Sequence, residues 1–154
     1  MKRGLEGVFT LLLCFLIVAI VAFLGSQFTD IGPWYYSIRP EITPPNWVFP
    51  IVWNILFFMI ALSLYFAWGK CQKKGNECKI LFVFGINFVL NVLWSFFYFY
   101  LKIPLLGFID ILLLLGSIIW LILILRKVSK PASWLLVPYL LWVMFATILN
   151  LLSI

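Results

Sequence analysis

Apolar residues occur along this chain in five long runs separated by short polar segments. Each run is close to the ~20 residues that a helix needs to cross a bilayer. The apolar–polar alternation of a membrane barrel is absent. Since lipid admits only helices and closed barrels, the pattern predicts an all-α membrane protein, a five-helix transmembrane bundle forming a single domain over residues 1–154. The expected spans are Val8–Leu24, Trp47–Trp68, Ile80–Tyr100, Pro104–Leu125 and Ala132–Leu152.

The first run has an alternative reading, because Met1-Lys2-Arg3 before it could open a signal peptide. The apolar core of such a peptide is usually ~7–15 residues long. The run of residues 8–24 exceeds that length, so we expect a retained helix.

Composition narrows the protein classes and the kinds of catalytic or metal site that this chain can have. Apolar residues make up 66% of the chain and charged residues 10%, which excludes a soluble enzyme, a disordered chain and a nucleic-acid binder. Without histidine, the Ser-His-Asp and Cys-His schemes and His-bound zinc or haem are excluded. Cys14, Cys71 and Cys78 match no common metal spacing, so no metal site and no resident cofactor are predicted. Free thiols are favoured over a disulfide or redox role for the last two.

The basic residues are unevenly distributed between the two sides of the bundle. Nine of the eleven Lys and Arg flank one set of span ends, and only Arg39 and Lys102 flank the other. The positive-inside rule therefore predicts a cytoplasmic N-terminus, with the C-terminus and the loop of residues 26–46 extracytoplasmic. Recognition of anionic lipid by the basic cluster is an alternative reading of the same charges.

The first loop, residues 26–46, is the longest connection. It contains four prolines and three consecutive aromatics: Pro33, Pro40, Pro44, Pro45, Trp34, Tyr35 and Tyr36. Long irregular loops in compact proteins are commonly functional lids. An ordered lid over the bundle is predicted, with a passive connector as the alternative. Asn46, at its end, is a candidate N-cap for the second span.

Polar and aromatic side chains recur at helical spacing inside three spans. The third span carries Asn87, Asn91 and Ser95, with Trp94 beside them; the fifth carries Trp142, Ala146 and Asn150, with Phe145 adjacent; the second carries Trp53 and Phe57. Residues four apart share a helical face. The amides either join helices by hydrogen bonds or line a tryptophan-walled pocket for a flat apolar ligand.

Two other residues inside the spans need an explanation. Asp110 is the only charged residue well inside a span. A helix-contact role is favoured for it over a transport role, because no second carboxylate shares the membrane. Pro138 removes a backbone hydrogen bond and is expected to kink the fifth span one turn before Trp142.

Three motifs in order resemble the TspO/MBR family of tryptophan-rich sensory proteins and translocator proteins, and the likeness extends over nearly the whole chain. The first comprises Trp34-Tyr35, Arg39-Pro40, Thr43 to Phe49 and Val52-Trp53; the second is Asn91 to Ser95; the third is Pro138 to Trp142 with Phe145-Ala146 and Leu149-Asn150. The segment from Trp34 to Pro40 is one residue shorter than the family pattern, so both Tyr35 and Tyr36 are candidates for its loop tyrosine.

The resemblance implies a five-helix bundle, often a homodimer, that binds porphyrins such as protoporphyrin IX and synthetic benzodiazepine-type ligands. Membrane lipid is its other expected partner, and nucleic acid is not one. Together with the polar stripes, the resemblance gives this set of ligand-binding candidates: Tyr35, Pro44, Pro45, Trp53, Phe57, Asn87, Asn91, Trp94, Trp142, Phe145 and Ala146. Some family members promote light-dependent porphyrin breakdown, a role that Trp53 and Trp142 would carry here.

Four functions are therefore open. Tetrapyrrole binding in sensing or regulation is favoured. Transport has little support, because there is no internal repeat or pair of broken helices. No general acid, base or metal site is visible, so no conventional enzyme is predicted, and porphyrin breakdown would have to be photochemical. A purely structural membrane protein is the fourth reading.

Overall fold

A computed structural model describes the backbone of residues 2–74 and 77–154, and the side chains of residues 5–70 and 79–154. The prediction for Cys71 and Cys78 falls outside the described side chains. Over the described residues the chain forms helices and no strand: α1 (Lys2–Phe28), α2 (Pro33–Ile38), α3 (Val48–Lys74), α4 (Glu77–Ser95), the π-helix η1 (Phe96–Tyr100), α5 (Pro104–Val128), α6 (Lys130–Leu135) and α7 (Val137–Leu151). Five stretches within them are long and apolar enough to cross a membrane, so the predicted five-helix membrane bundle is confirmed.

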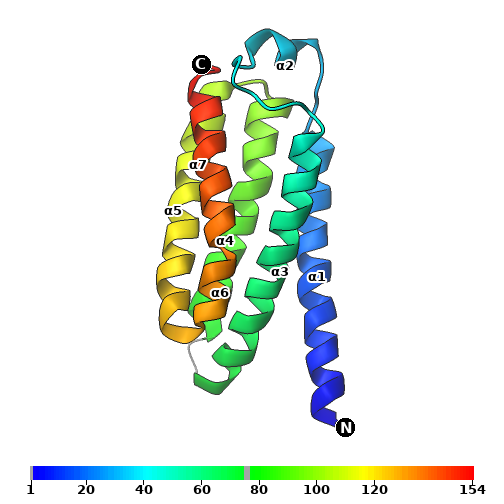
Figure 1. The fold of residues 1–154 in the computed structure, drawn as a ribbon, viewed down its shortest axis with the longest axis vertical. Coiled ribbons are helices and arrows are strands. Elements are labelled where there is room, and N and C mark those ends of the chain that lie inside the picture. Colours follow the sequence, from blue (N-terminus) through cyan, green and yellow to red (C-terminus); the bar gives the residue numbers. More distant parts are fainter. Residues whose placement is uncertain (1, 75–76) are drawn as a thin grey trace.

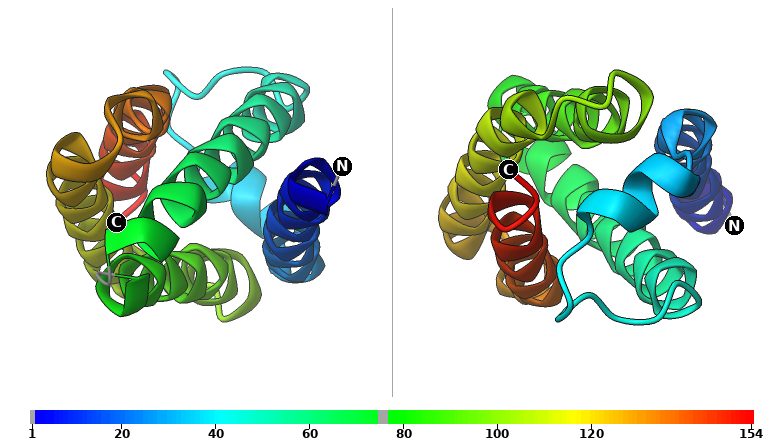
Figure 2. Two further views of the ribbon diagram at one scale, coloured as in Figure 1. Left: turned by 90° about the horizontal axis from the view of Figure 1, so that it is seen from below. Right: turned by 90° about the horizontal axis from the view of Figure 1, so that it is seen from above.

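The long helices stand side by side, with α2 across one end and the N-terminus at the other (Figure 1). Seen along the bundle, α1 lies at one edge, and α5 lies away from it on the far side (Figure 2). α4 packs on α1 and α5, α7 packs on α5, and α3 contacts α1, α4 and α6. By contrast, α3 touches α7 at few points. α5 therefore packs closely on both α4 and α7, while α3 packs on the fifth span mainly through α6.

The fifth span is broken where a kink is expected. α6 ends at Leu135 and α7 begins at Val137, with Pro138 in the first turn of α7. Proline has no N–H for the helical ladder, which accounts for the break. Just before it, the Ala132 carbonyl accepts a bond of 2.7 Å from the buried Ser63 hydroxyl of α3. This bond joins α3 to α6 at the end of the bundle away from α2.

The third span ends in a single wide turn rather than in α-helix. In η1 the Leu101 N–H donates to the Phe96 carbonyl five residues earlier, at 2.9 Å. Tyr98 and Phe99 are both buried in this turn, and π-turns of this kind are frequent at functional sites. The chain then reverses at Lys102, whose φ is 58° and whose ammonium lies 3.8 Å from Asp30.

The loop between α1 and α3 is ordered, as predicted for a lid. α2 forms within it, with Pro33 in the first turn where the missing N–H costs nothing. The prediction that Asn46 caps α3 is wrong. Its amide nitrogen donates to the Tyr36 hydroxyl at 2.7 Å, and its Oδ1 has no partner. The bond ties α2 to the end of the loop just before α3 instead.

Candidate functional site

Polar side chains from three helices meet in the centre of the bundle. The Asn87 amide of α4 donates to the Ser117 hydroxyl of α5 at 2.8 Å. The Asn91 amide donates to the Tyr139 hydroxyl of α7 at 3.1 Å, and Tyr139 in turn donates to Asn87 Oδ1 at 3.4 Å. All four residues are buried. The two amides therefore join α4 to α5 and α7, which is one of the two roles that their spacing allowed.

Tyr139 lies at this centre but is not among the ligand-binding residues predicted from the sequence. It is 1% exposed, and its hydroxyl bonds both asparagines. Its position, seven residues before Ala146, places it on the same face of the fifth span. That spacing, together with the polar tip of a tyrosine ring, is a signal that could have identified it from the sequence.

Trp94 belongs to a second bonded layer, closer to α2. Its indole N–H donates to Asn150 Oδ1 at 3.1 Å, and the Asn150 amide donates to the Pro104 carbonyl at 2.9 Å. The Trp94 ring stacks on Tyr98 with centroids 5.6 Å apart. Gly107 of α5 packs closely here, since a Cβ at that position would lie 3.1 Å from both Asn150 Oδ1 and Tyr98 Cβ.

The boundary between α3 and α7 is built from aromatic rings. Trp53 stacks on Phe57 at 5.3 Å and meets the edge of Tyr139 at 6.3 Å. Trp142 contacts Phe49 at 5.8 Å and Phe145 at 5.7 Å. No side-chain hydrogen bond joins α3 to α7 among residues 48–70 and 137–151. Edge-to-face ring contacts therefore cross the boundary that contains most of the predicted ligand-binding rings.

Three polar atoms near this boundary are buried without a hydrogen-bond partner. They are the Trp142 indole nitrogen, Asn46 Oδ1 and Thr43 Oγ1. Asn46 and Thr43 belong to the segment that leaves α2 and passes α7 on its way to α3 (Figure 2). Buried polar atoms are nearly always paired in native proteins, by the chain or by ordered water, so these three atoms are available to a polar partner.

The lid packs on α4 and η1 through Tyr35. This residue is 7% exposed and forms a small apolar cluster with Tyr98 and Phe99. Burial, and then the neighbouring Tyr98, raises the pKa of the Tyr35 phenol above its ordinary value. Tyr36, the other candidate, is half exposed under the Arg39 guanidinium. Tyr35 is thus the loop tyrosine that faces the bundle.

The remaining candidates are placed as follows. Ala146 is buried on α7, Pro44 is partly buried, and Pro45 is exposed. Asp110 is 4% exposed, and its Oδ2 has no partner. No group of three His, Cys, Asp or Glu gathers among the described residues. Two surface hollows lie between helices at the end away from α2, and neither is lined by a predicted site residue.

A family model and comparison with individual proteins both identify the same family. Residues 12–153 match the model of the TspO/MBR family. The chain is 44% identical to the tryptophan-rich protein TspO of Chlorobaculum tepidum, covering 94% of each chain. It is 40% identical to the protein of that name in Archaeoglobus fulgidus, over 88% of each. It is 31% identical to the translocator protein of Ovis aries, over 83% of this chain and 78% of the relative.

Proposed function

The chain belongs to the TspO/MBR family of membrane proteins, and from this membership we propose that it binds a flat, hydrophobic tetrapyrrole such as protoporphyrin IX inside the bundle. The ligand would enter between α3 and α7, beneath the segment of the lid that joins α2 to α3. Two features support this place. Two edge-to-face ring pairs, Phe49–Trp142 and Trp53–Tyr139, cross that boundary, and a planar apolar ligand can replace ring–ring contacts with ring–ligand contacts at small cost.

The unpaired Trp142 indole N–H is the observation that carries the proposal. A buried donor without an acceptor costs about 1–3 kcal/mol, and an acceptor on the ligand, such as a carboxylate, would recover that free energy. Asn46 Oδ1, also unpaired, accepts hydrogen bonds and suits a ligand donor such as a pyrrole N–H. The complementary pair favours an amphiphilic ring system over a hydrocarbon.

The residues of the proposed site form three groups: aromatic side walls, a hydrogen-bonded far side, and part of the lid. Trp53, Phe57, Trp142 and Phe145 form the aromatic walls, and the small Ala146 leaves room between them. Asn87, Asn91 and Trp94 hold the far side through the bonds described above. Tyr35, Pro44 and Pro45 belong to the cover. In this proposal the protein senses or regulates tetrapyrroles as a homodimer, with its N-terminus in the cytoplasm.

Titration with protoporphyrin IX tests the proposal. The Soret absorbance of the porphyrin reports binding without depending on how many tryptophans a variant keeps. The parent should give a saturable shift at micromolar or lower concentration. Trp142→Phe keeps a ring but removes the donor, so binding should weaken about tenfold, the equivalent of one hydrogen bond of ~1.4 kcal/mol.

Trp120→Phe is the matched control, because Trp120 is 49% exposed on α5 and remote from the proposed walls. It should bind like the parent. A parent that gives no saturable shift, or equal affinities for Trp142→Phe and the parent, would overturn the proposal.

A further inference from the structure

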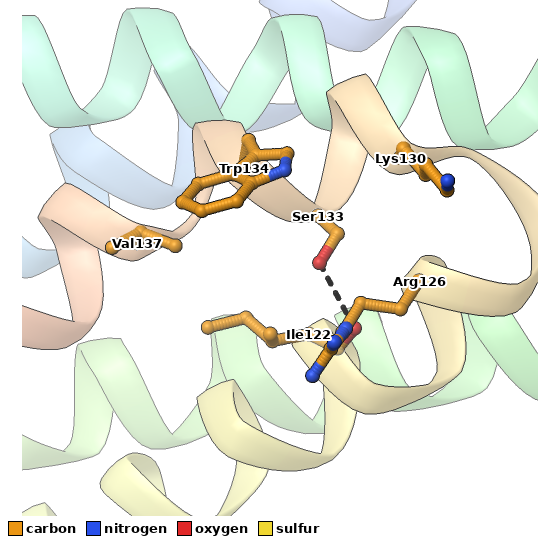
Figure 3. Close-up of a pocket in the computed structure, with 6 residues that line it drawn as sticks. All are labelled: Ile122, Arg126, Lys130, Ser133, Trp134 and Val137. Carbon is orange, nitrogen blue, oxygen red and sulfur yellow. Dashed lines mark hydrogen bonds between the residues drawn. The ribbon is translucent and has the colours of Figure 1, made fainter.

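A surface hollow lies between the last turns of α5 and the start of the fifth span. It has a volume of about 400 Å³ and is lined by Ile122, Arg126, Lys130, Ser133, Trp134 and Val137 (Figure 3). That volume is within the range of about 300–1,000 Å³ typical of small-molecule sites. It lies at the end of the bundle opposite α2, so it is separate from the proposed tetrapyrrole site (Figure 1).

The charge in this hollow is of one sign. Arg126 and Lys130 are exposed, and no acidic residue is among the lining residues. Neither cation forms an ion pair with any residue whose side chain the structure describes. The Ser133 hydroxyl already donates to the Ile122 carbonyl at 3.1 Å (Figure 3). The position of Arg126 in the last turn of α5 also suits the helix dipole, but that interaction leaves the guanidinium donors available.

The rest of the lining is apolar and lies at the membrane boundary. Ile122 and Val137 form the sides, and the Trp134 ring stands over them with 72% of its surface exposed (Figure 3). The apolar stretches 104–128 and 130–151 end and begin beside the hollow. Tryptophan at this depth sits at the level of the lipid headgroups. A molecule that fits must therefore have an anionic head and an apolar body.

We propose that this hollow binds one anionic phospholipid. Its phosphate contacts Arg126 and Lys130, and the upper part of an acyl chain lies along Ile122, Val137 and the Trp134 ring. Charge complementarity selects the occupant, because a zwitterionic lipid brings a cation against two cations. At this depth in the bilayer, phospholipid is the molecule that combines an acidic head with an apolar tail.

Lipid titration of the purified protein in neutral detergent tests the assignment. Short-chain phosphatidylglycerol and phosphatidylcholine with the same acyl chains are compared by thermal unfolding midpoint, and native mass spectrometry counts the phospholipids retained. Phosphatidylglycerol should raise the midpoint further and be retained. Arg126→Gln and Lys130→Gln should each weaken its apparent affinity about fivefold, the usual worth of one basic residue at an anionic membrane surface.

Lys70→Gln is the matched control, since it removes one exposed charge from the same end of the bundle outside the hollow. It should bind phosphatidylglycerol like the parent. Arg126→Lys keeps the charge and should retain most of the affinity, which guards against a folding defect in the Gln variants. Three results would overturn the proposal: equal effects of Lys70→Gln and Arg126→Gln, equal shifts with phosphatidylcholine, or the full shift with inorganic phosphate alone.

Discussion

Trp94 and Trp142 are two tryptophans of one predicted site, yet they lie in opposite kinds of environment. The Trp94 indole N–H donates to Asn150, which is itself bonded to the Pro104 carbonyl. The Trp142 N–H is buried with no partner. Since the residue type is the same, the difference comes from the neighbours: the chain supplies an acceptor on the α4 side and none on the α3 side.

The same contrast extends to the helices that carry the two residues. Side-chain hydrogen bonds join α4 to α5 and α7 in two layers, whereas ring contacts without a side-chain hydrogen bond join residues 48–70 of α3 to α7. A membrane protein gains little from burying apolar surface between helices, so hydrogen bonds and close packing set how firmly two helices associate. The α4 side of the predicted site is thus joined by hydrogen bonds, and the α3 side by ring contacts.

Enlarging Gly107 should produce the largest loss of stability, because it acts on the bonded half. A side chain at this position would collide with Asn150 Oδ1 and Tyr98 Cβ, each 3.1 Å from its Cβ. Gly107→Leu should lower the free energy of unfolding by about 1–3 kcal/mol, the usual cost of overpacking. Thermal unfolding in detergent measures it. A Cβ at Gly116 on the same helix would meet nothing within 4 Å, so Gly116→Leu should unfold like the parent; equal losses in both would contradict the close packing.

Paired Trp→Phe variants test the comparison directly, with a smaller effect. Both changes remove similar ring volume, so their difference isolates the indole hydrogen bond. Trp94→Phe leaves Asn150 Oδ1 without its donor, whereas Trp142→Phe removes a donor that had no acceptor. The ligand-free Trp94→Phe protein should be less stable than Trp142→Phe by at least about 1 kcal/mol, because it loses a bond worth ~0.6–1.7 kcal/mol in membranes while Trp142→Phe removes an unpaired buried donor. Equal midpoints in thermal unfolding would remove the distinction.

The sequence predicts most of the fold, because long apolar runs leave a chain in lipid few alternatives. The five spans, the break at Pro138 and the ordered lid all follow from local chemistry. The helices extend beyond the runs, as α1 does to Lys2 and Phe28, since flanking polar residues also adopt helix outside the hydrocarbon. The π-turn at Phe96–Tyr100 could not be predicted, because its wide turn depends on how Tyr98 and Phe99 pack against the lid.

The site is only partly predictable, and the amides explain why. Helical spacing places Asn87 and Asn91 on one face, but it does not specify what lies opposite. Ser117 and Tyr139 are 30 and 52 residues from Asn87 in the chain, so only the packed bundle reveals that the amides are already paired. The unpaired Trp142 N–H is equally invisible in the sequence, because it is the absence of a tertiary contact.

The smallest expected effect concerns where the lid is anchored. Tyr35 packs on Tyr98 and Phe99, so the lid rests on the bonded half and leaves the Trp142 side to the segment that follows α2. Burial raises the pKa of Tyr35, which means that the folded protein holds the phenolic proton more tightly than the unfolded chain, where the pKa is about 10. The stability from this group is therefore fully present below pH ~10 and is lost as the pH rises through the folded-state pKa.

Tyr35→Phe keeps the ring and removes this dependence, so above pH ~10 its thermal midpoint should fall less steeply than that of the parent. Phe99→Leu loosens the same cluster without removing an ionisable group, and should lower the midpoint while preserving the slope of the parent. The comparison depends on slopes because many groups titrate at alkaline pH and contribute equally to parent and variant. If the thermal midpoints of Tyr35→Phe and the parent fall in parallel with rising pH, the Tyr35 hydroxyl is exposed to water in solution. The lid would then have to be anchored on the side of α3 and Trp142 instead.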